Sequence, residues 1–179
     1  MNLFYLDKPI SKCAEAHVDR HVVKMIVEAA QLLSTAHRVL DGEEYYDKTS
    51  NGRNIKRWRL YDEREDLIYK ATHVNHPCAR WTRETVNQYL WTYEYFMALM
   101  EEYEYRYGKR HKCLGYFSML LGSPPHNLKK MGWSDPPAAM PDEYKTDDVM
   151  ESYRNYYREG KKHLHSWKHR DPPVWLSEN

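Results

Sequence analysis

Residues 11–38 read SKCAEAHVDRHVVKMIVEAAQLLSTAHR, a stretch with the 3.6-residue periodicity of an α-helix and an unusual distribution of polar groups. At about 100° per residue, one row of polar side chains falls within an arc of roughly 80°. The row consists of His17, His21, Lys24, Glu28 and Gln31, and Thr35 continues it. Apolar residues surround this row on both sides. The stretch therefore predicts a buried helix whose polar row faces an interior feature.

This polar row has two interpretations. The structural one is a paired internal network or a solvent-facing seam, because an unpaired buried polar group costs about 1–3 kcal/mol. The functional one is a reactive site, because two imidazoles, an amine and a carboxylate on one face are a costly combination for structure alone. His17 and His21, four residues apart, could also share a metal ion. A third ligand would then come from another segment, with His73 and His76 as candidates.

Length and composition favour one helical domain. The chain has 179 residues and only seven glycines, with long stretches of good helix formers and few alternating β-branched runs. We therefore expect an all-α fold, a single compact bundle of about five helices in one domain over residues 1–179. The helices are predicted over residues 11–38, 54–72, 77–107, 111–121 and 147–165, with a polar loop over 41–53 and a long proline-rich loop over 122–146.

The cysteine content and the hydropathy of the chain indicate the cellular compartment to expect. Cys13, Cys78 and Cys113 form no CxxC pair, and their odd number is typical of a reducing compartment. The opening residues lack the pattern of a signal peptide, and no apolar stretch reaches membrane-spanning length. We therefore expect a soluble cytoplasmic protein without a membrane partner. The net charge of +1 does not by itself indicate a nucleic-acid binder.

A second cluster of polar residues lies where one predicted helix ends and the next begins. It consists of His73, Asn75, His76 and Arg80. A helix N-terminus presents free backbone N–H groups to phosphate or carboxylate, and an arginine one turn later adds a bidentate contact. The cluster is therefore either a substrate or phosphate site or simply the cap of the helix that begins at Pro77.

The predicted last helix combines basic and aromatic side chains. Its candidate substrate-binding residues are Tyr153, Arg154, Tyr157, Arg158 and Lys161. Cations interleaved with aromatic rings suit a phosphate backbone with stacked bases, so DNA or a nucleotide is the expected partner. The alternative is a solvated basic face whose tyrosines pack onto the core.

The order of these features resembles the all-helical pyrimidine-dimer DNA glycosylases of the endonuclease V type, which occur in phages. The similar elements are the opening Met1-Asn2-Leu3, the AEAH segment at 14–17, the aromatic stretch 89–106 and the YRNYY segment at 153–157. The resemblance implies a helical fold and a DNA substrate contacted by the C-terminal segment. It also implies an N-terminal amine that forms a Schiff base with the sugar, assisted by a glutamate of the first helix. A phage-encoded protein of this type would work in the host cytoplasm.

This sequence departs from that family at two positions. With His17 aligned to the family's histidine, Lys24 occupies the position of the catalytic glutamate, and the nearest carboxylate is Glu28. The family also uses a free amine on residue 2, whereas the large Asn2 is expected to leave Met1 in place. The reactive amine is then that of Met1 or that of Lys24.

The leading hypothesis is a DNA glycosylase/AP-lyase that acts on a modified or damaged base without a cofactor. An amine attacks the sugar C1′, Glu28 handles the proton, and His17 and His21 position the substrate. One alternative is a metal-dependent hydrolase or nucleotide-processing enzyme with a divalent ion such as zinc on the two histidines. Another is a non-catalytic module that binds a nucleotide or a protein.

Overall fold

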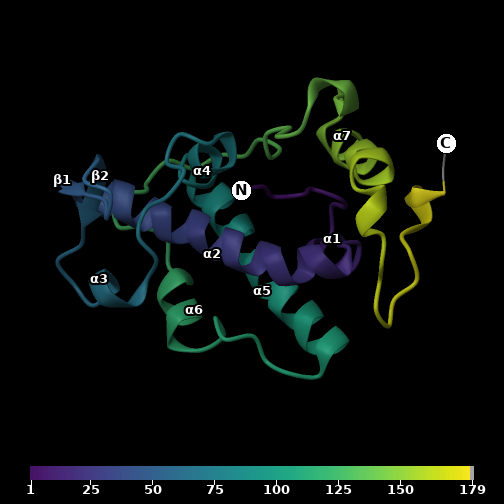
Figure 1. Ribbon diagram of the computed structural model, residues 1–179, viewed down its shortest axis with the longest axis horizontal. Coiled ribbons are helices and arrows are strands. Elements are labelled where there is room, and N and C mark those ends of the chain that lie inside the picture. Colours follow the sequence, from purple (N-terminus) through teal and green to yellow (C-terminus); the bar gives the residue numbers. More distant parts are fainter. Residues whose placement is uncertain (178–179) are drawn as a thin grey trace.

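In the computed structural model, which describes residues 1–177, the helix predicted over residues 11–38 is two helices. α1 spans Ile10–Glu15 and α2 spans Asp19–Asp41 (Figure 1). At the start of α2, the Asp19 N–H donates to the Ser166 carbonyl at 2.8 Å. The C-terminal segment thus helps to fix the break. His17 falls between the two helices, and α2 carries the rest of the polar row.

α2 packs along α5, the other long helix, which spans Val86–Tyr107. The apolar core lies around this pair, and among the described residues every buried side-chain polar group except the Ser34 hydroxyl has a hydrogen-bond partner. His37 Nε2, for example, lies 2.7 Å from the Tyr89 hydroxyl. The N-terminal segment, residues 1–6, starts beside α4 (Pro77–Thr82) and runs toward α1 in Figure 1, and residues 3–6 are buried. Two long helices therefore organise the fold, and the expected single bundle of about five helices is not confirmed.

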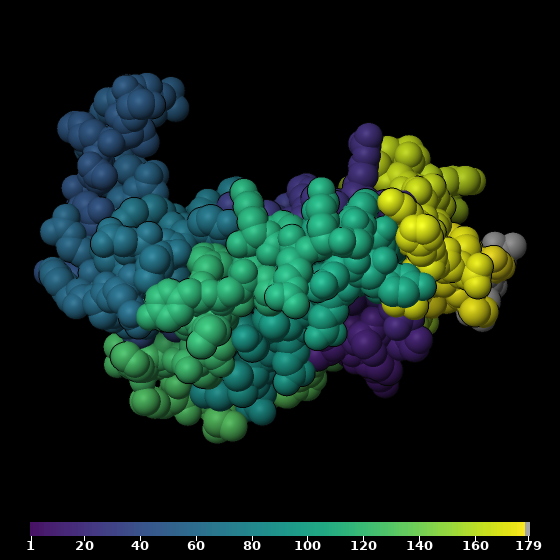
Figure 2. All heavy atoms as spheres, turned by 90° about the horizontal axis from the view of Figure 1, so that it is seen from below, coloured from purple at the N-terminus to yellow at the C-terminus, as the bar shows by residue number. Residues whose placement is uncertain are grey.

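A β-hairpin replaces the loop predicted over residues 41–53 and the first part of the helix predicted over 54–72, so both predictions are wrong here. β1 spans Glu43–Lys48 and β2 spans Asn54–Arg59, and the two strands pair antiparallel. Tyrosine, isoleucine and tryptophan side chains favour strands, and Gly52 supplies the positive φ of 78° at the turn. Figure 2 shows the hairpin, in blue, projecting from the body of the molecule.

Arg38 explains why the chain after the hairpin is not helical. The helix there, α3, spans only Arg64–Leu67. The fully buried Arg38 guanidinium donates to the carbonyls of Tyr69 and Ile68 at 2.7 and 3.2 Å. It also pairs with the Glu65 carboxylate at 2.6 Å. These contacts hold the segment wrapped around the arginine, whereas a continuous helix would use backbone carbonyls for its own hydrogen bonds.

The helix predicted over residues 77–107 is also two helices. α4 spans Pro77–Thr82, and α5 begins at Val86. Between them Thr85 acts as the N-cap of α5, because its side-chain oxygen accepts from the Gln88 N–H at 3.2 Å. A second helix start therefore lies inside the stretch that the periodicity predicted as one helix.

The remaining elements are short. α6 spans Tyr116–Leu121, shorter than predicted over residues 111–121, because Gly115 with a φ of 133° precedes it. The proline-rich loop carries a 3-10 turn at Asp142–Tyr144. α7 spans Val149–Asn155 and continues into a π-helical turn, Tyr156–Gly160, and a 3-10 turn, Lys162–Leu164. A last 3-10 turn spans Val174–Leu176. The fold is mostly helical with one small sheet. Over the described residues, no helix combines the length and apolarity needed to cross a membrane.

Candidate active site

Glu28 on α2 is the point where three nitrogen groups meet. The Met1 ammonium lies 3.7 Å from Glu28 Oε2, and the Asn2 N–H donates to the same oxygen at 3.0 Å. On the other side, Lys24 Nζ lies 3.3 Å from Glu28 Oε1. The Glu28 side chain is 13% exposed and that of Lys24 is 66% exposed. One carboxylate therefore joins an α-amine at the edge of the core to a largely exposed lysine. We call these groups of Met1, Lys24 and Glu28 the amine centre.

Contacts of the neighbouring residues hold the main chain at Met1 in place. Residues 3–6 are buried, and the Asn2 side chain donates to the Ala139 carbonyl at 2.8 Å and accepts from the Tyr153 hydroxyl at 2.7 Å. The Met1 side chain is only 3% exposed, while Met1 as a whole is partly exposed. The exposed part of Met1 is therefore in its main chain, which the contacts of Asn2 hold in place.

The turn before α4 brings His76 within electrostatic reach of the amine. His76 is the N-cap of α4, and its Nδ1 accepts a backbone N–H of the first turn at 3.2 Å. Burial lowers the pKa of His76, and the Met1 ammonium and His73 lower it further. His76 therefore has the capping role and also lies within electrostatic reach of the amine. Asn75 and Arg80 are exposed on either side of it.

The other end of the polar row is buried and paired internally. His17 Nδ1 lies 2.6 Å from the Cys13 carbonyl, and His17 Nε2 lies 2.7 Å from the Tyr95 hydroxyl. His21 Nδ1 lies 2.6 Å from the Tyr157 hydroxyl. Burial lowers the pKa of both histidines to about 3, so both rings are neutral near pH 7. Both His17 nitrogens are engaged, and in the described part of the chain no three His, Cys, Asp or Glu side chains gather as metal ligands.

The basic and aromatic residues of the C-terminal segment mostly make internal contacts. Tyr153 and Tyr157 are fully buried. Arg154 donates to a carbonyl of the N-terminal segment at 3.0 Å, and Arg158 donates to one near the C-terminus at 2.8 Å. Lys161 Nζ lies 4.7 Å from the centre of a neighbouring tyrosine ring. The tyrosines thus pack onto the core, and the two arginines bind the main-chain carbonyls of Leu6 and Trp175.

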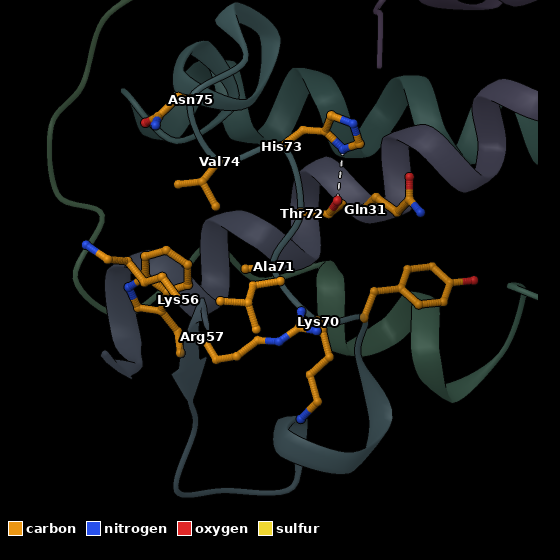
Figure 3. Close-up of a pocket in the computed structure, with 12 residues that line it drawn as sticks. Gln31, Lys56, Arg57, Lys70, Ala71, Thr72, His73, Val74 and Asn75 are labelled. Atoms are coloured by element: carbon orange, nitrogen blue, oxygen red, sulfur yellow. Dashed lines mark hydrogen bonds between the residues drawn. The ribbon is translucent and has the colours of Figure 1, made fainter. Parts of the chain in front are cut away.

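Beyond Glu28, the polar row of α2 leads into a pocket. Gln31, one turn further along, lines a cavity of about 680 Å³ between α2, strand β2 and residues 69–75 (Figure 3). The chemically distinctive lining residues are the cations Lys56, Arg57 and Lys70, the aromatic residues Trp58 and Tyr69, and the amide of Asn75. No Asp or Glu is among the described residues that line it. The cavity is therefore both basic and aromatic.

Sequence reasoning missed this pocket because it placed residues 54–72 in one helix. The cavity forms only when β2 and the segment after α3 come back to face α2. The signal that could have revealed the hairpin is the Asn51-Gly52 dipeptide, which marks hairpin turns when it lies between two strand-forming stretches. Reading it as a turn would have separated Arg57 from the predicted helix.

Comparison with known proteins adds no assignment to this site. No family model, curated protein or solved structure matches the chain. Its function is therefore inferred from the chemistry of the amine centre and of the cavity beside it.

Proposed function

We propose that this protein is a DNA glycosylase/AP-lyase-type enzyme that acts on a modified or damaged base through an amine nucleophile. The observation that carries the proposal is the Met1 ammonium 3.7 Å from the Glu28 carboxylate, at a partly exposed position. Schiff-base chemistry at a sugar C1′ needs an amine and a group that takes up and returns its protons. The sequence resemblance to glycosylases of the endonuclease V type points to the same class of reaction.

The reaction begins when Glu28 accepts a proton from the amine. The nitrogen lone pair then forms a bond to C1′ of an exposed nucleotide, the bond from C1′ to the base breaks, and the base leaves with that electron pair and takes the proton from Glu28, which becomes a carboxylate again. The nitrogen loses a second proton to the carboxylate, the C1′–O4′ bond breaks, and O4′ is protonated. The product is a protonated imine between protein and sugar. Removal of a C2′ proton then expels the 3′ phosphate, and water releases the amine.

Two amines flank Glu28, and the α-amine is the better nucleophile. The main chain at Met1 is fixed through Asn2, whereas the Lys24 side chain is 66% exposed. We assign Lys24 to a supporting role, as a cation that attracts the phosphate backbone toward the amine.

Borohydride reduction tests the proposal, because it converts the imine into a stable covalent bond. The protein is incubated with duplexes that contain an abasic site or a damaged or modified base, reduced, and separated by denaturing electrophoresis. Intact mass establishes that Met1 is the first residue, and proteolysis with mass spectrometry identifies the modified one. We expect an adduct on Met1. Absence of an adduct with every substrate would overturn the proposal.

Two variants separate the two amines. A Gly-Ser extension before Met1 moves the terminal amine away from Glu28 and should lower trapping at least tenfold. Lys24→Gln leaves the Met1 amine in place and should keep the adduct on Met1. An adduct on Lys24, or trapping that the extension does not diminish, would assign the nucleophile to Lys24 instead.

A further inference from the structure

The cavity between α2 and β2 plays no part in the amine chemistry, and its charge is not fully compensated. Lys56 pairs with Glu44 at 2.9 Å, and Lys70 pairs with Glu65 at 2.5 Å. Neither of these carboxylates lines the cavity. Arg57, which is partly buried, has no carboxylate partner among the residues that the structure describes. A guanidinium in this position is a ready partner for an anion, and its planar fork matches the oxygens of a phosphate.

The rest of the lining suits a flat ring. Trp58 and Tyr69 provide aromatic surface, and base stacking on such side chains contributes about 1–3 kcal/mol per base. The amides of Gln31 and Asn75 can each donate and accept hydrogen bonds at a base edge. A volume of about 680 Å³ lies within the usual range of small-ligand sites. A cavity that can bind both a phosphate and a flat base fits a nucleotide.

The cavity adjoins the amine centre. Gln31 follows Glu28 by three residues, a rise of about 4.5 Å along the helix. His73 lines the cavity and lowers the pKa of His76. The Met1 ammonium lowers the same pKa. In Figure 3, Gln31 and His73 lie at the same side of the cavity.

We infer that this cavity binds one nucleotide, with Arg57 on its phosphate and Trp58 or Tyr69 against its base. The nucleotide belongs to the same DNA strand as the sugar at the amine centre and is its neighbour. The choice of a strand over a free nucleotide rests on the proposed function, whereas the binding of a nucleoside phosphate follows from the lining itself.

Calorimetric titration of the whole protein tests this inference with three probes: thymidine monophosphate, inorganic phosphate and a single-stranded DNA decamer. Arg57→Gln removes the phosphate contact. Arg53→Gln is the matched control, because it removes the same charge from an exposed position of the same hairpin that does not line the cavity. We expect Arg57→Gln to weaken binding of the monophosphate and the decamer at least tenfold and Arg53→Gln to weaken each less than twofold.

The probes distinguish the possible ligands. Monophosphate binding at least tenfold tighter than phosphate supports a nucleotide site, and equal binding would overturn it in favour of a simple anion patch. Decamer binding at least tenfold tighter than that of the monophosphate supports a strand, whereas equal affinities would assign a free nucleotide instead. Equal losses in Arg57→Gln and Arg53→Gln would overturn the site altogether.

The titrations can succeed or fail independently of the borohydride test of the proposed function, because they involve no covalent step. Nucleotide binding that depends on Arg57, together with no borohydride adduct, would keep the site and remove the reaction. A Met1 adduct that forms equally well in Arg57→Gln, at DNA concentrations below saturation, would keep the reaction and remove the binding of the neighbouring nucleotide of the same strand from this cavity.

Discussion

The two ends of the polar row on α2 have the same helical spacing but opposite surroundings. His21 is 4% exposed and lies against Phe4 and the Tyr157 hydroxyl, so aromatic side chains from distant segments seal it. Two turns later, Glu28 contacts the N-terminal segment, and the Lys24 side chain paired with it is 66% exposed. Helical spacing places these groups on one face, and what covers the face determines which of them are available for chemistry.

Replacement of Glu28 tests the open end of the row and should give the largest effect. Glu28→Gln keeps the size of the side chain and an acceptor for the Asn2 N–H, but it cannot take up the amine protons. We expect borohydride trapping on Met1 to fall at least a hundredfold, about 2.7 kcal/mol in activation free energy. The free energy of unfolding should change by about 1 kcal/mol or less. Trapping at the wild-type rate would remove the carboxylate from the reaction.

Replacement of His17 tests the sealed end, where the effect should be on stability. His17→Ala leaves the Cys13 carbonyl and the Tyr95 hydroxyl without their partner in the core. We expect a loss of about 3 kcal/mol in the free energy of unfolding, measured by urea titration. The exposed His73 is the control, and His73→Ala should change this free energy by less than about 0.5 kcal/mol. Similar losses in the two variants would contradict the contrast between the two ends.

Acid should destabilise the protein through the sealed histidines. Burial lowers the pKa of His17 and His21 to about 3 in the folded state, whereas an unfolded histidine titrates near 6.5. Between these values the unfolded chain binds more protons, so stability falls as pH falls, by about 1.4 kcal/mol per pH unit for each histidine. His37, with its pKa lowered to about 4, acts in the same direction. Urea titrations at pH 7, 6 and 5 measure this slope.

The variant His21→Gln sharpens this test, because glutamine cannot take up a proton in this range but can still bond to the Tyr157 hydroxyl. Its stability should depend on pH less steeply than that of the wild type, by about 1.4 kcal/mol per pH unit. An unchanged slope would mean that His21 takes up its proton equally in the folded and the unfolded protein. Burial would then not protect the sealed end of the row from protonation.

The local pattern places Lys24 and Glu28 on one face of a helix, and their ion pair depends only on this spacing. It also placed a helix start at Pro77, where a proline and a capping residue are adjacent in sequence. The proline-rich stretch over residues 122–146 likewise forms the long connection that its composition indicates, apart from one short turn. These features are local, so single-sequence reasoning could find them.

The features that sequence reasoning missed depend on contacts between distant segments. The break before α2 involves the Ser166 carbonyl, and the shape of the segment after the hairpin depends on the buried Arg38. The cavity around Arg57 needs both the hairpin and that segment in place. The position of Met1 beside Glu28 was available only as one implication of a family resemblance, because no periodicity relates residue 1 to residue 28.

The smallest expected effect concerns the exposed lysine of the amine centre. Lys24→Gln removes an i, i+4 ion pair that is largely in solvent, so the free energy of unfolding should change by less than about 0.5 kcal/mol. If Lys24 draws the DNA backbone toward the amine, the variant should bind an abasic duplex several-fold more weakly. The slope of log affinity against log salt concentration should then fall by about one. Fluorescence anisotropy at several salt concentrations measures both quantities.

Lys12 supplies the matched control for this last comparison. It forms a similar exposed ion pair with Glu15 at 2.7 Å, and its side chain is 61% exposed, but it lies on α1 and not on α2 beside Glu28. Lys12→Gln removes the same charge and should cost equally little stability, while DNA affinity and its salt dependence stay close to those of the wild type. Equal losses of affinity in the two variants would mean that Lys24 contributes only general charge, and the open end of the row would then owe its DNA contacts to other groups.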